Sequence, residues 1–159
     1  MTHTGPMIRT REIRELNMRI AILSVQEEVS NVVAHICEWL GGHGVAEDIR
    51  GELELVLAEA LNNVVEHAYL YREDGEIEIN VKLTPDEMTA TITDSGQKFD
   101  GPPPLTEVDV DGFAFDDLPE GGFGWNLIRT LTDNVHFERR ENKNCLRLSR
   151  NLNPDVELV

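Results

Sequence analysis

The chain has 159 residues, of which 40% are hydrophobic and 28% are charged, values typical of a single globular domain. Its formal net charge of −16 argues against direct binding to nucleic acids or anionic membranes, because both would repel it. No stretch has the roughly 18–20 apolar residues of a membrane span, and the N-terminus lacks an apolar signal region. Cys37 and Cys145 lack metal or disulfide spacing, so we expect reduced thiols and a cytoplasmic location.

The first half of the chain predicts one strand followed by two helices. Residues 16–22 alternate apolar and polar side chains, which is the pattern of a half-buried strand. The sequence SVQE at residues 24–27 has the spacing of a capping box, and apolar residues then recur at helical spacing until GGHG at 41–44 ends the helix. A longer second helix with an apolar stripe is predicted from about residue 46 to 71.

The second half predicts two β-hairpins, separated by a long loop and a third helix. Residues 77–83 and 88–92 alternate on either side of the turn TPDE, and Asp94 ends the second strand. Residues 95–121 are rich in Gly, Pro and Asp, and a loop of this length is usually functional or disordered. A helix and a final hairpin with its turn at residues 142–144 follow. This order favours an α+β fold, a mostly antiparallel sheet with helices on one face.

The sequence EALNNVVEHAY at residues 59–69 is unusual for the end of a core helix. Asn has low helix propensity because its side chain competes for backbone hydrogen bonds. Glu59, Asn63 and His67 are spaced four residues apart, so they form one line along the edge of the apolar stripe. An unpartnered amide at that edge would be costly, so either neighbouring backbone or a metal ion or ligand is expected to satisfy Asn63.

Two further segments are compatible with either turn chemistry or nucleotide binding. In DSGQKFD, Asp94 and Gly96 can form a turn, or they can present an acceptor for an exocyclic amine beside a flat ring. In EGGFGWNLI at residues 120–128, glycines before a helix can form a tight turn or present free N–H groups to phosphate. No GKS or GKT follows, so this segment is not a Walker A loop.

In this order the three segments resemble the N, G1 and G2 boxes of the GHKL ATPases. Within that family the likeness is greatest to the anti-sigma-factor serine kinases of the RsbW and SpoIIAB type. The resemblance extends over about residues 12–152, with an N-terminal extension at 1–11 and a C-terminal tail at 153–159. It implies a two-layer α/β sandwich, the Bergerat ATP-binding fold, with an ATP lid at about residues 97–121.

The resemblance also implies roles at the phosphate end of the site. Asn63 matches the asparagine that ligates Mg²⁺, a hard cation that takes oxygen ligands and usually keeps several waters. Glu59, one helical turn earlier, matches the glutamate proposed as general base. Gly122, Phe123 and Gly124 match the phosphate-binding turn at a helix N-terminus.

At the base end, Asp94 matches the acid that accepts a hydrogen bond from the adenine amino group, and Gly96 the glycine beneath the ring. The branch often has a threonine near the adenine at the start of the last strand, where this chain has Asn144 and Cys145. For His67 the resemblance is compatible with ligand contact, but we expect a packing role.

The activity implied is that of an ATP-binding anti-sigma factor and protein serine/threonine kinase. It would use ATP and Mg²⁺ to phosphorylate a STAS-type anti-anti-sigma antagonist, bind a sigma factor and form a homodimer. Residues 100–121 contain no Arg or Lys, so a cation for the γ-phosphate must come from elsewhere, with Lys98 as a candidate. Two alternatives stay open: a nucleotide-gated protein-binding module with little or no kinase activity, and a detached histidine-kinase ATP domain.

Overall fold

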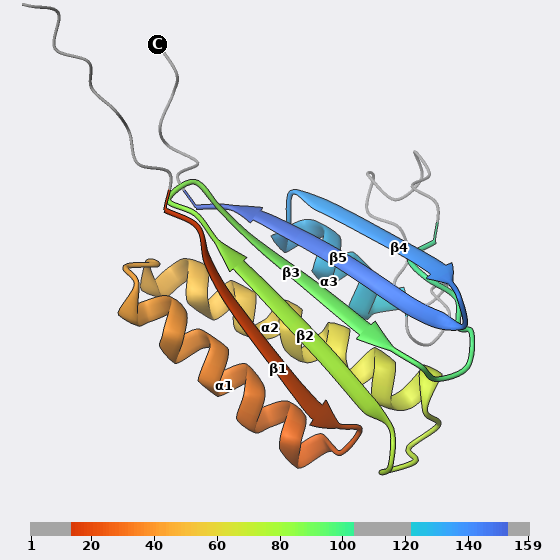
Figure 1. Cartoon of the computed structure of the whole chain (residues 1–159). Helices are drawn as coiled ribbons and strands as arrows, with labels where there is room; N and C mark the ends of the chain where they lie inside the picture. Colours follow the sequence, from red (N-terminus) through yellow and green to blue (C-terminus); the bar gives the residue numbers. More distant parts are fainter. Residues whose placement is uncertain (1–13, 104–121, 153–159) are drawn as a thin grey trace, which may run out of the picture.

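The structure, a computed structural model, describes residues 14–103 and 122–152, with the side chains of residues 122 and 123 outside that description. Its elements, in chain order, are β1 (Leu16–Leu23), α1 (Gln26–Gly42), α2 (Glu47–Asn63), the π-helical segment η1 (Val64–Ala68), β2 (Glu76–Leu83), β3 (Glu87–Asp94), α3 (Gly122–Leu131), β4 (Asn134–Arg140) and β5 (Lys143–Asn151). The five strands form one antiparallel sheet in the order β1-β2-β3-β5-β4 (Figure 1).

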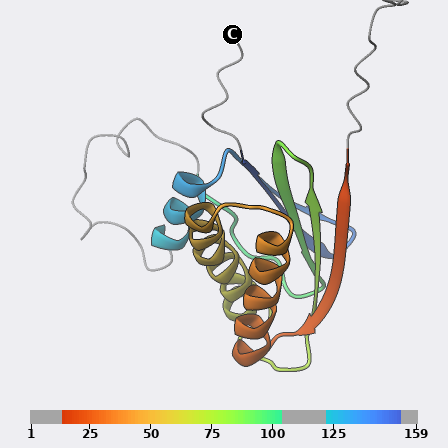
Figure 2. The same ribbon diagram turned by 90° about the vertical axis from the view of Figure 1, so that its left-hand side faces the viewer.

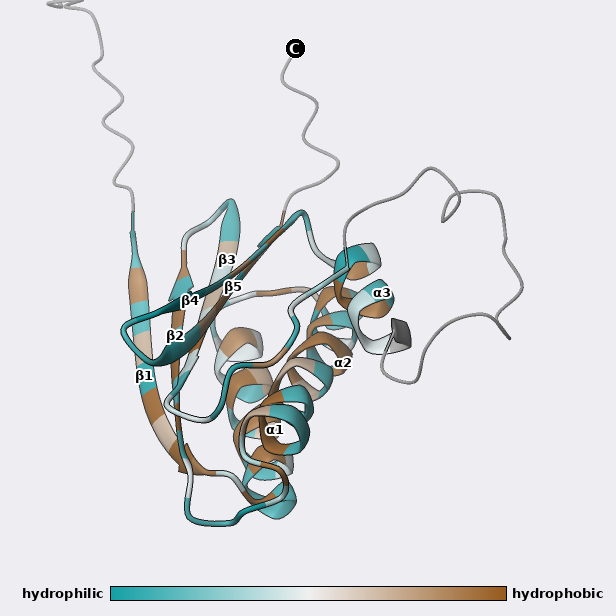
Figure 3. Ribbon diagram, turned by 90° about the vertical axis from the view of Figure 1, so that its right-hand side faces the viewer, coloured by the Kyte–Doolittle hydropathy of each residue, from teal (hydrophilic) through white to brown (hydrophobic). Residues whose placement is uncertain are grey.

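The fold has two layers, as the sequence predicted. The three helices lie on one face of the sheet (Figure 2), with α1 packed on α2 and α2 packed on α3. Apolar and polar residues are interleaved along the helices and strands (Figure 3), so each element can turn one side towards the core. No helix in the described ranges is long and apolar enough to cross a membrane.

The core is formed where the alternating strand residues meet the helices. Ile79, Ile92 and Leu146 are adjacent in the register of β2, β3 and β5, and all three are buried. The next row includes Thr91 opposite Arg147, which is exposed, because successive side chains of a strand point to opposite faces. The predicted hairpins are confirmed, but the final turn is centred on Glu141 and Asn142, both at positive φ, and not on residues 142–144, because β5 already begins at Lys143.

The predicted capping box is wrong. Helix α1 has Val25 as its N-cap residue and no side-chain capping bond. Ser24 is only 1% exposed, and its hydroxyl donates to the Arg72 carbonyl and accepts from the Gly75 N–H at 3.0 Å. The hydroxyl that the local pattern assigned to the helix therefore makes a tertiary contact between the end of β1 and the loop before β2.

The second helix also ends differently from its prediction. Regular α-helix stops at Asn63, and η1 continues with wider turns in which the Tyr69 N–H bonds to the Val64 carbonyl at 3.1 Å. Leu70 and Tyr71 then adopt positive φ values of 51° and 64°, which ends the helical path. Single π-turns inside helices occur frequently at functional sites.

Candidate functional site

Three of the predicted site residues meet where α3 begins on α2. A Cβ added to Gly124 would lie 2.9 Å from Glu59 Oε2 and 3.8 Å from both the oxygen and the nitrogen of the Asn63 amide. The first turn of α3 therefore lies directly over these two side chains. Any residue larger than glycine at this position would displace the Glu59 carboxylate.

Asn63 is buried without full hydrogen bonding. The residue is 7% exposed, and its Nδ2 has no hydrogen-bond partner among the described residues. Buried polar atoms are nearly always paired, so an exception calls for an explanation, such as a bound ligand. Of the two alternatives that the sequence left open, backbone satisfaction is not observed for this nitrogen. Asn62 and Glu66 are exposed on the other side of the helical path, as predicted.

Glycine residues form the start of α3 rather than a turn before it. The helix begins at Gly122, so Gly122, Phe123 and Gly124 make up its first turn. The N–H groups of a first turn have no partner inside the helix, and together with the helix dipole they favour an anion. A phosphate at this terminus would lie beside Glu59 and Asn63. Direct contact of these residues with a nucleotide stays a prediction.

Mg²⁺ fits the residues at this end of the site. The described part of the chain has no group of three or more His, Cys, Asp or Glu side chains that could hold a metal ion. A Mg²⁺ ion that takes most of its ligands from phosphates and waters needs no such group, and a single amide oxygen is a suitable protein ligand. The unpartnered atom of Asn63 is Nδ2, a donor that suits a phosphate oxygen at this helix terminus, and the oxygen of the same amide would be the ligand for Mg²⁺.

Asp94 occupies the end of β3 in a buried environment. The residue is 2% exposed, and its Oδ1 accepts hydrogen bonds from the Gly96 N–H at 2.9 Å and from Asn144 Nδ2 at 2.8 Å. Burial raises the pKa of this carboxyl, while the bonds from Asn144 and Gly96 and the charge of Arg139 act in the opposite direction. Asp94 is therefore a buried acceptor whose orientation is fixed by its neighbours.

The structure gives a reason for glycine at position 96 that the sequence did not reveal. A Cβ added there would lie 2.5 Å from the Ala68 carbonyl oxygen, a contact that real side chains do not make. The Gln97 N–H donates to the same carbonyl at 2.9 Å, and Gln97 Nε2 donates to the His67 carbonyl at 3.0 Å. Glycine is needed here because the loop after β3 packs directly on the backbone of η1. Its predicted place beneath an adenine ring remains untested.

His67 and Tyr69, at the end of the EALNNVVEHAY segment, have packing roles within the described residues. The His67 ring stacks on Phe99, with 6.1 Å between centroids. The Tyr69 hydroxyl donates to the Glu76 carbonyl at 2.6 Å and accepts from the Ser95 N–H at 2.9 Å. Tyr69 therefore joins the end of η1 to β2 and to the loop that follows Asp94.

Sequence reasoning missed Arg139 entirely and treated Asn144 only as a departure from the family. Arg139 Nη1 donates to the Gly96 carbonyl at 2.8 Å and to Asn144 Oδ1 at 3.1 Å. Asn144 is 1% exposed and lies opposite Asp94 in the register of β3 and β5. The only sequence signal was a polar residue in a strand position that otherwise alternates towards the core. Cys145, the next residue, belongs to the opposite face.

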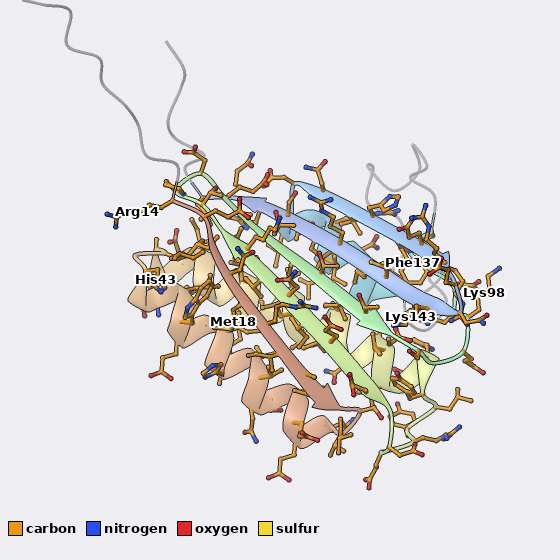
Figure 4. The ribbon with its side chains drawn as sticks, viewed as in Figure 1. Arg14, Met18, His43, Lys98, Phe137 and Lys143 are labelled. Carbon is orange, nitrogen blue, oxygen red and sulfur yellow. The ribbon has the colours of Figure 1, made fainter. Side chains whose placement is uncertain are left out.

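Most of the predicted lid, residues 104–121, lies outside the described residues. The described beginning of the lid packs on aromatic rings. The ring centroids of Phe99 and Phe137 are 5.0 Å apart, and those of Phe137 and Trp125, at the start of α3, are 6.1 Å apart. Lys98, the cation proposed for the γ-phosphate, is exposed at the same end of the sheet as Phe137 (Figure 4). Its role stays a prediction.

The comparisons with known proteins agree with this geometry. Residues 22–150 match the model of the histidine kinase-like ATPase domain. The serine-protein kinase RsbW of Halalkalibacterium halodurans is 36% identical over 104 residues, which cover 60% of this chain and 59% of that protein. For RsbW of Bacillus subtilis the values are 30% over 97 residues, 60% and 61%. These alignments span less than two thirds of either protein.

Further relatives extend the same comparison. The serine/threonine-protein kinase BtrW of Bordetella bronchiseptica is 31% identical over 111 residues, which cover 67% of this chain and 74% of that protein. The crystal structure of the RsbU and RsbW domains of Rv1364c from Mycobacterium tuberculosis shares the fold, with a TM-score of 0.62 at 17% identity over 86% of this chain and 32% of that one. The chain therefore belongs to the histidine kinase-like ATPase domain family, in the branch that includes the RsbW-type serine-protein kinases.

Proposed function

We propose that this chain binds ATP with Mg²⁺ and transfers the γ-phosphate to a serine or threonine hydroxyl of a partner protein. One observation carries the proposal: the first turn of α3 lies on Glu59 and on the incompletely bonded amide of Asn63. A helix N-terminus, which favours phosphate, thus lies beside an amide that offers an oxygen to a cation and a carboxylate that can accept a proton, and this proximity supports the proposal.

The residues divide the chemistry among them. Asp94 accepts the hydrogen bond of the adenine amino group, and the N–H groups of Gly122, Phe123 and Gly124 bind phosphate oxygens. Asn63 would hold Mg²⁺, which when bound neutralises charge on the phosphates. Glu59 orients the partner's hydroxyl and accepts its proton while the oxygen–phosphorus bond forms and the bond to ADP breaks. Transfer is direct, so no residue of this chain is phosphorylated as an intermediate.

The relatives' names support the class of reaction, and the resemblance to the anti-sigma-factor kinases suggests the partner. RsbW and BtrW are named as serine or serine/threonine protein kinases, and we propose a STAS-type anti-anti-sigma protein as the substrate of this chain. A sigma factor would be its second partner, released or bound according to the phosphorylation of the first. A homodimer and a cytoplasmic location belong to the same proposal.

Calorimetric titration with ATP, with and without Mg²⁺, tests the first half of the proposal. We expect saturable binding that is strengthened by Mg²⁺, and loss of the Mg²⁺ effect in Asn63→Ala. Asn62→Ala is the matched control, because that asparagine is exposed on the same helix and should leave binding unchanged. No binding at millimolar ATP would contradict the proposal.

Incubation with radiolabelled ATP and a candidate STAS-domain protein tests the second half. The expected result is label on a serine or threonine of that protein. Binding of ATP without transfer to any cognate antagonist would instead favour a nucleotide-gated binding module, the function suggested by the absence of Arg and Lys from residues 100–121.

A further inference from the structure

Three polar residues stand side by side across the ends of three neighbouring strands. Asp94 of β3 is opposite Asn144 of β5, and Asn144 is opposite Arg139 of β4. In the same row, the next strand contributes Ile77, which is fully buried. Replacing apolar residues by a carboxyl, an amide and a guanidinium in a core-facing row costs stability unless each group is paired. The hydrogen-bond partners of these three residues therefore indicate their role.

The hydrogen bonds of Asn144 are almost completely used by the protein. Its Nδ2 donates to Asp94 Oδ1 at 2.8 Å and to the Gln97 carbonyl at 2.9 Å, and its Oδ1 accepts from Arg139 at 3.1 Å. An amide nitrogen has two hydrogens, so no donor is left for a ligand. Asn144 can therefore influence a bound molecule only through the groups it holds.

Arg139 fixes the other side of the same arrangement. Its Nη1 bonds both to the Asn144 amide and to the Gly96 carbonyl at 2.8 Å, and within the described residues it has no carboxylate at ion-pair distance. The guanidinium thus holds the loop after β3 to β4. Both hydrogen bonds described for the Asp94 side chain go to Oδ1, so the carboxylate is held by one oxygen.

We propose that Asn144 and Arg139 are positioning residues that orient the Asp94 carboxylate and the Gly96 backbone, and that they set the selectivity of the site for a 6-amino purine over a 6-keto purine. The inference rests on the proposed function, because it assumes that Asp94 accepts from the adenine amino group. A 6-keto purine presents an acceptor at that position, which an oriented carboxylate repels. A carboxylate free to rotate would discriminate less.

Paired titrations with ATP and ITP test the proposal. We expect wild-type protein to prefer ATP, and Asn144→Ala to lower that preference about tenfold, the loss of roughly one charge-assisted hydrogen bond. Asn134→Ala is the matched control: it removes the 3.1 Å bond from Asn134 to Ser149 at the other end of the same hairpin, and it should leave the preference unchanged. Thermal unfolding establishes that each variant is folded.

A second variant separates orientation from general damage. Asn144→Asp keeps the side-chain shape but replaces the donor by an acceptor, so the pH below which ATP binding weakens should move upwards. Among the described residues, the charged or titratable groups that interact with Asp94 are Arg139 on β4 and Tyr69 at the end of η1, and neither changes in this variant. Arg139→Gln should lower the ATP preference by less than Asn144→Ala.

The outcomes distinguish the two proposals. If wild type prefers ATP over ITP and a folded Asn144→Ala variant shows the same preference, the positioning role is overturned. The proposed function would stand in that case. Equal binding of ATP and ITP by wild type would remove Asp94 as the base-reading group and the inference with it. Binding of neither nucleotide by wild type would overturn the proposed function first, and this inference as its consequence.

Discussion

Helices α1 and α2 are both 17 residues long and pack side by side in the helix layer, yet they differ in the kind of residue that they bury. Every buried residue of α1 is apolar, namely Val29, Val32, Val33, Ile36 and Leu40. The buried set of α2 is also apolar until its last residue, Asn63, after which the helix widens into η1. Packing explains α1 completely, whereas the end of α2 contains groups that packing would exclude.

The energetic difference between the two helices is large for single residues. Burying an aliphatic side chain such as those of α1 contributes about 1.5–3 kcal/mol, whereas a buried polar group without a partner costs about 1–3 kcal/mol. A folded chain tolerates the second kind of residue mainly where function requires it. The comparison therefore supports the proposal that the functional site lies at the end of α2, and the following experiments test that proposal.

The largest effect should come from Glu59→Gln, which removes the carboxylate under the first turn of α3 but keeps its size. We expect phosphate transfer to fall by about 10²–10⁴-fold, the usual contribution of a general base, with the affinity for ATP little changed. Rates from labelled ATP and affinities from calorimetry measure the two effects. Transfer at the wild-type rate would contradict the role of Glu59 and weaken the contrast between the helices.

Stability should respond in opposite ways on α1 and α2. Ile36→Ala, in the fully buried stripe of α1, should lower the free energy of unfolding by about 2–5 kcal/mol. Asn63→Ala should leave it unchanged or raise it, because the variant removes a buried nitrogen without a partner. Urea denaturation of both variants makes the comparison. A destabilisation by Asn63→Ala as large as that of Ile36→Ala would show that Asn63 is an ordinary packing residue.

Asp94→Asn tests the other end of the site. We expect about tenfold weaker ATP binding, since a neutral amide is a poorer acceptor than a carboxylate. Burial raises the pKa of the Asp94 carboxyl, so the folded state holds this proton more tightly than the unfolded state does. Stability contributed by this group therefore falls as pH rises from the ordinary carboxyl pKa to the raised one.

The same variant thus has a pH signature. The free energy of unfolding of Asp94→Asn minus that of wild type should be larger at neutral pH than in acid. At neutral pH wild type bears the cost of a buried charge that the variant lacks, and in acid protonation removes that cost from wild type. Unfolding curves between about pH 3 and 7 measure this difference, a range that brackets the ordinary carboxyl pKa. A difference independent of pH would mean that Asp94 does not titrate in this range.

The smallest effect, and the most local, is expected from Gly124→Ala. Alanine favours helix by about 0.5–1 kcal/mol over glycine, but its Cβ would lie 2.9 Å from Glu59 Oε2 and displace that carboxylate. Phosphate transfer should fall while stability is kept. Gly51→Ala, an exposed position of α2 with nothing within 4 Å of the new Cβ, should give the helix effect alone. Equal rates of phosphate transfer in the two variants would show that a Cβ at position 124 does not disturb the function of Glu59.

Much of the fold followed from local patterns. Alternation predicted the strands that became β1, β2 and β3, and helical spacing predicted α1 and most of α2, because burial of one face imposes those periods. Two local predictions failed, the first of them because a tertiary contact competed with the local one. Ser24 bonds to the loop before β2 rather than capping α1, and the chain after Asn63 widens into a π-helical segment.

Glu59, Asn63 and Asp94 could be singled out from the sequence, because they are polar groups at positions that the patterns place in or beside the core, and the resemblance to the GHKL ATPases supplied their expected roles. The contacts that hold these side chains in place became visible only in the folded structure. Placing β5 between β3 and β4 brings Asn144 and Arg139, which are close to each other but about fifty residues from Asp94 in sequence, into one row with it. Strand order is set by long-range packing, which no local periodicity records.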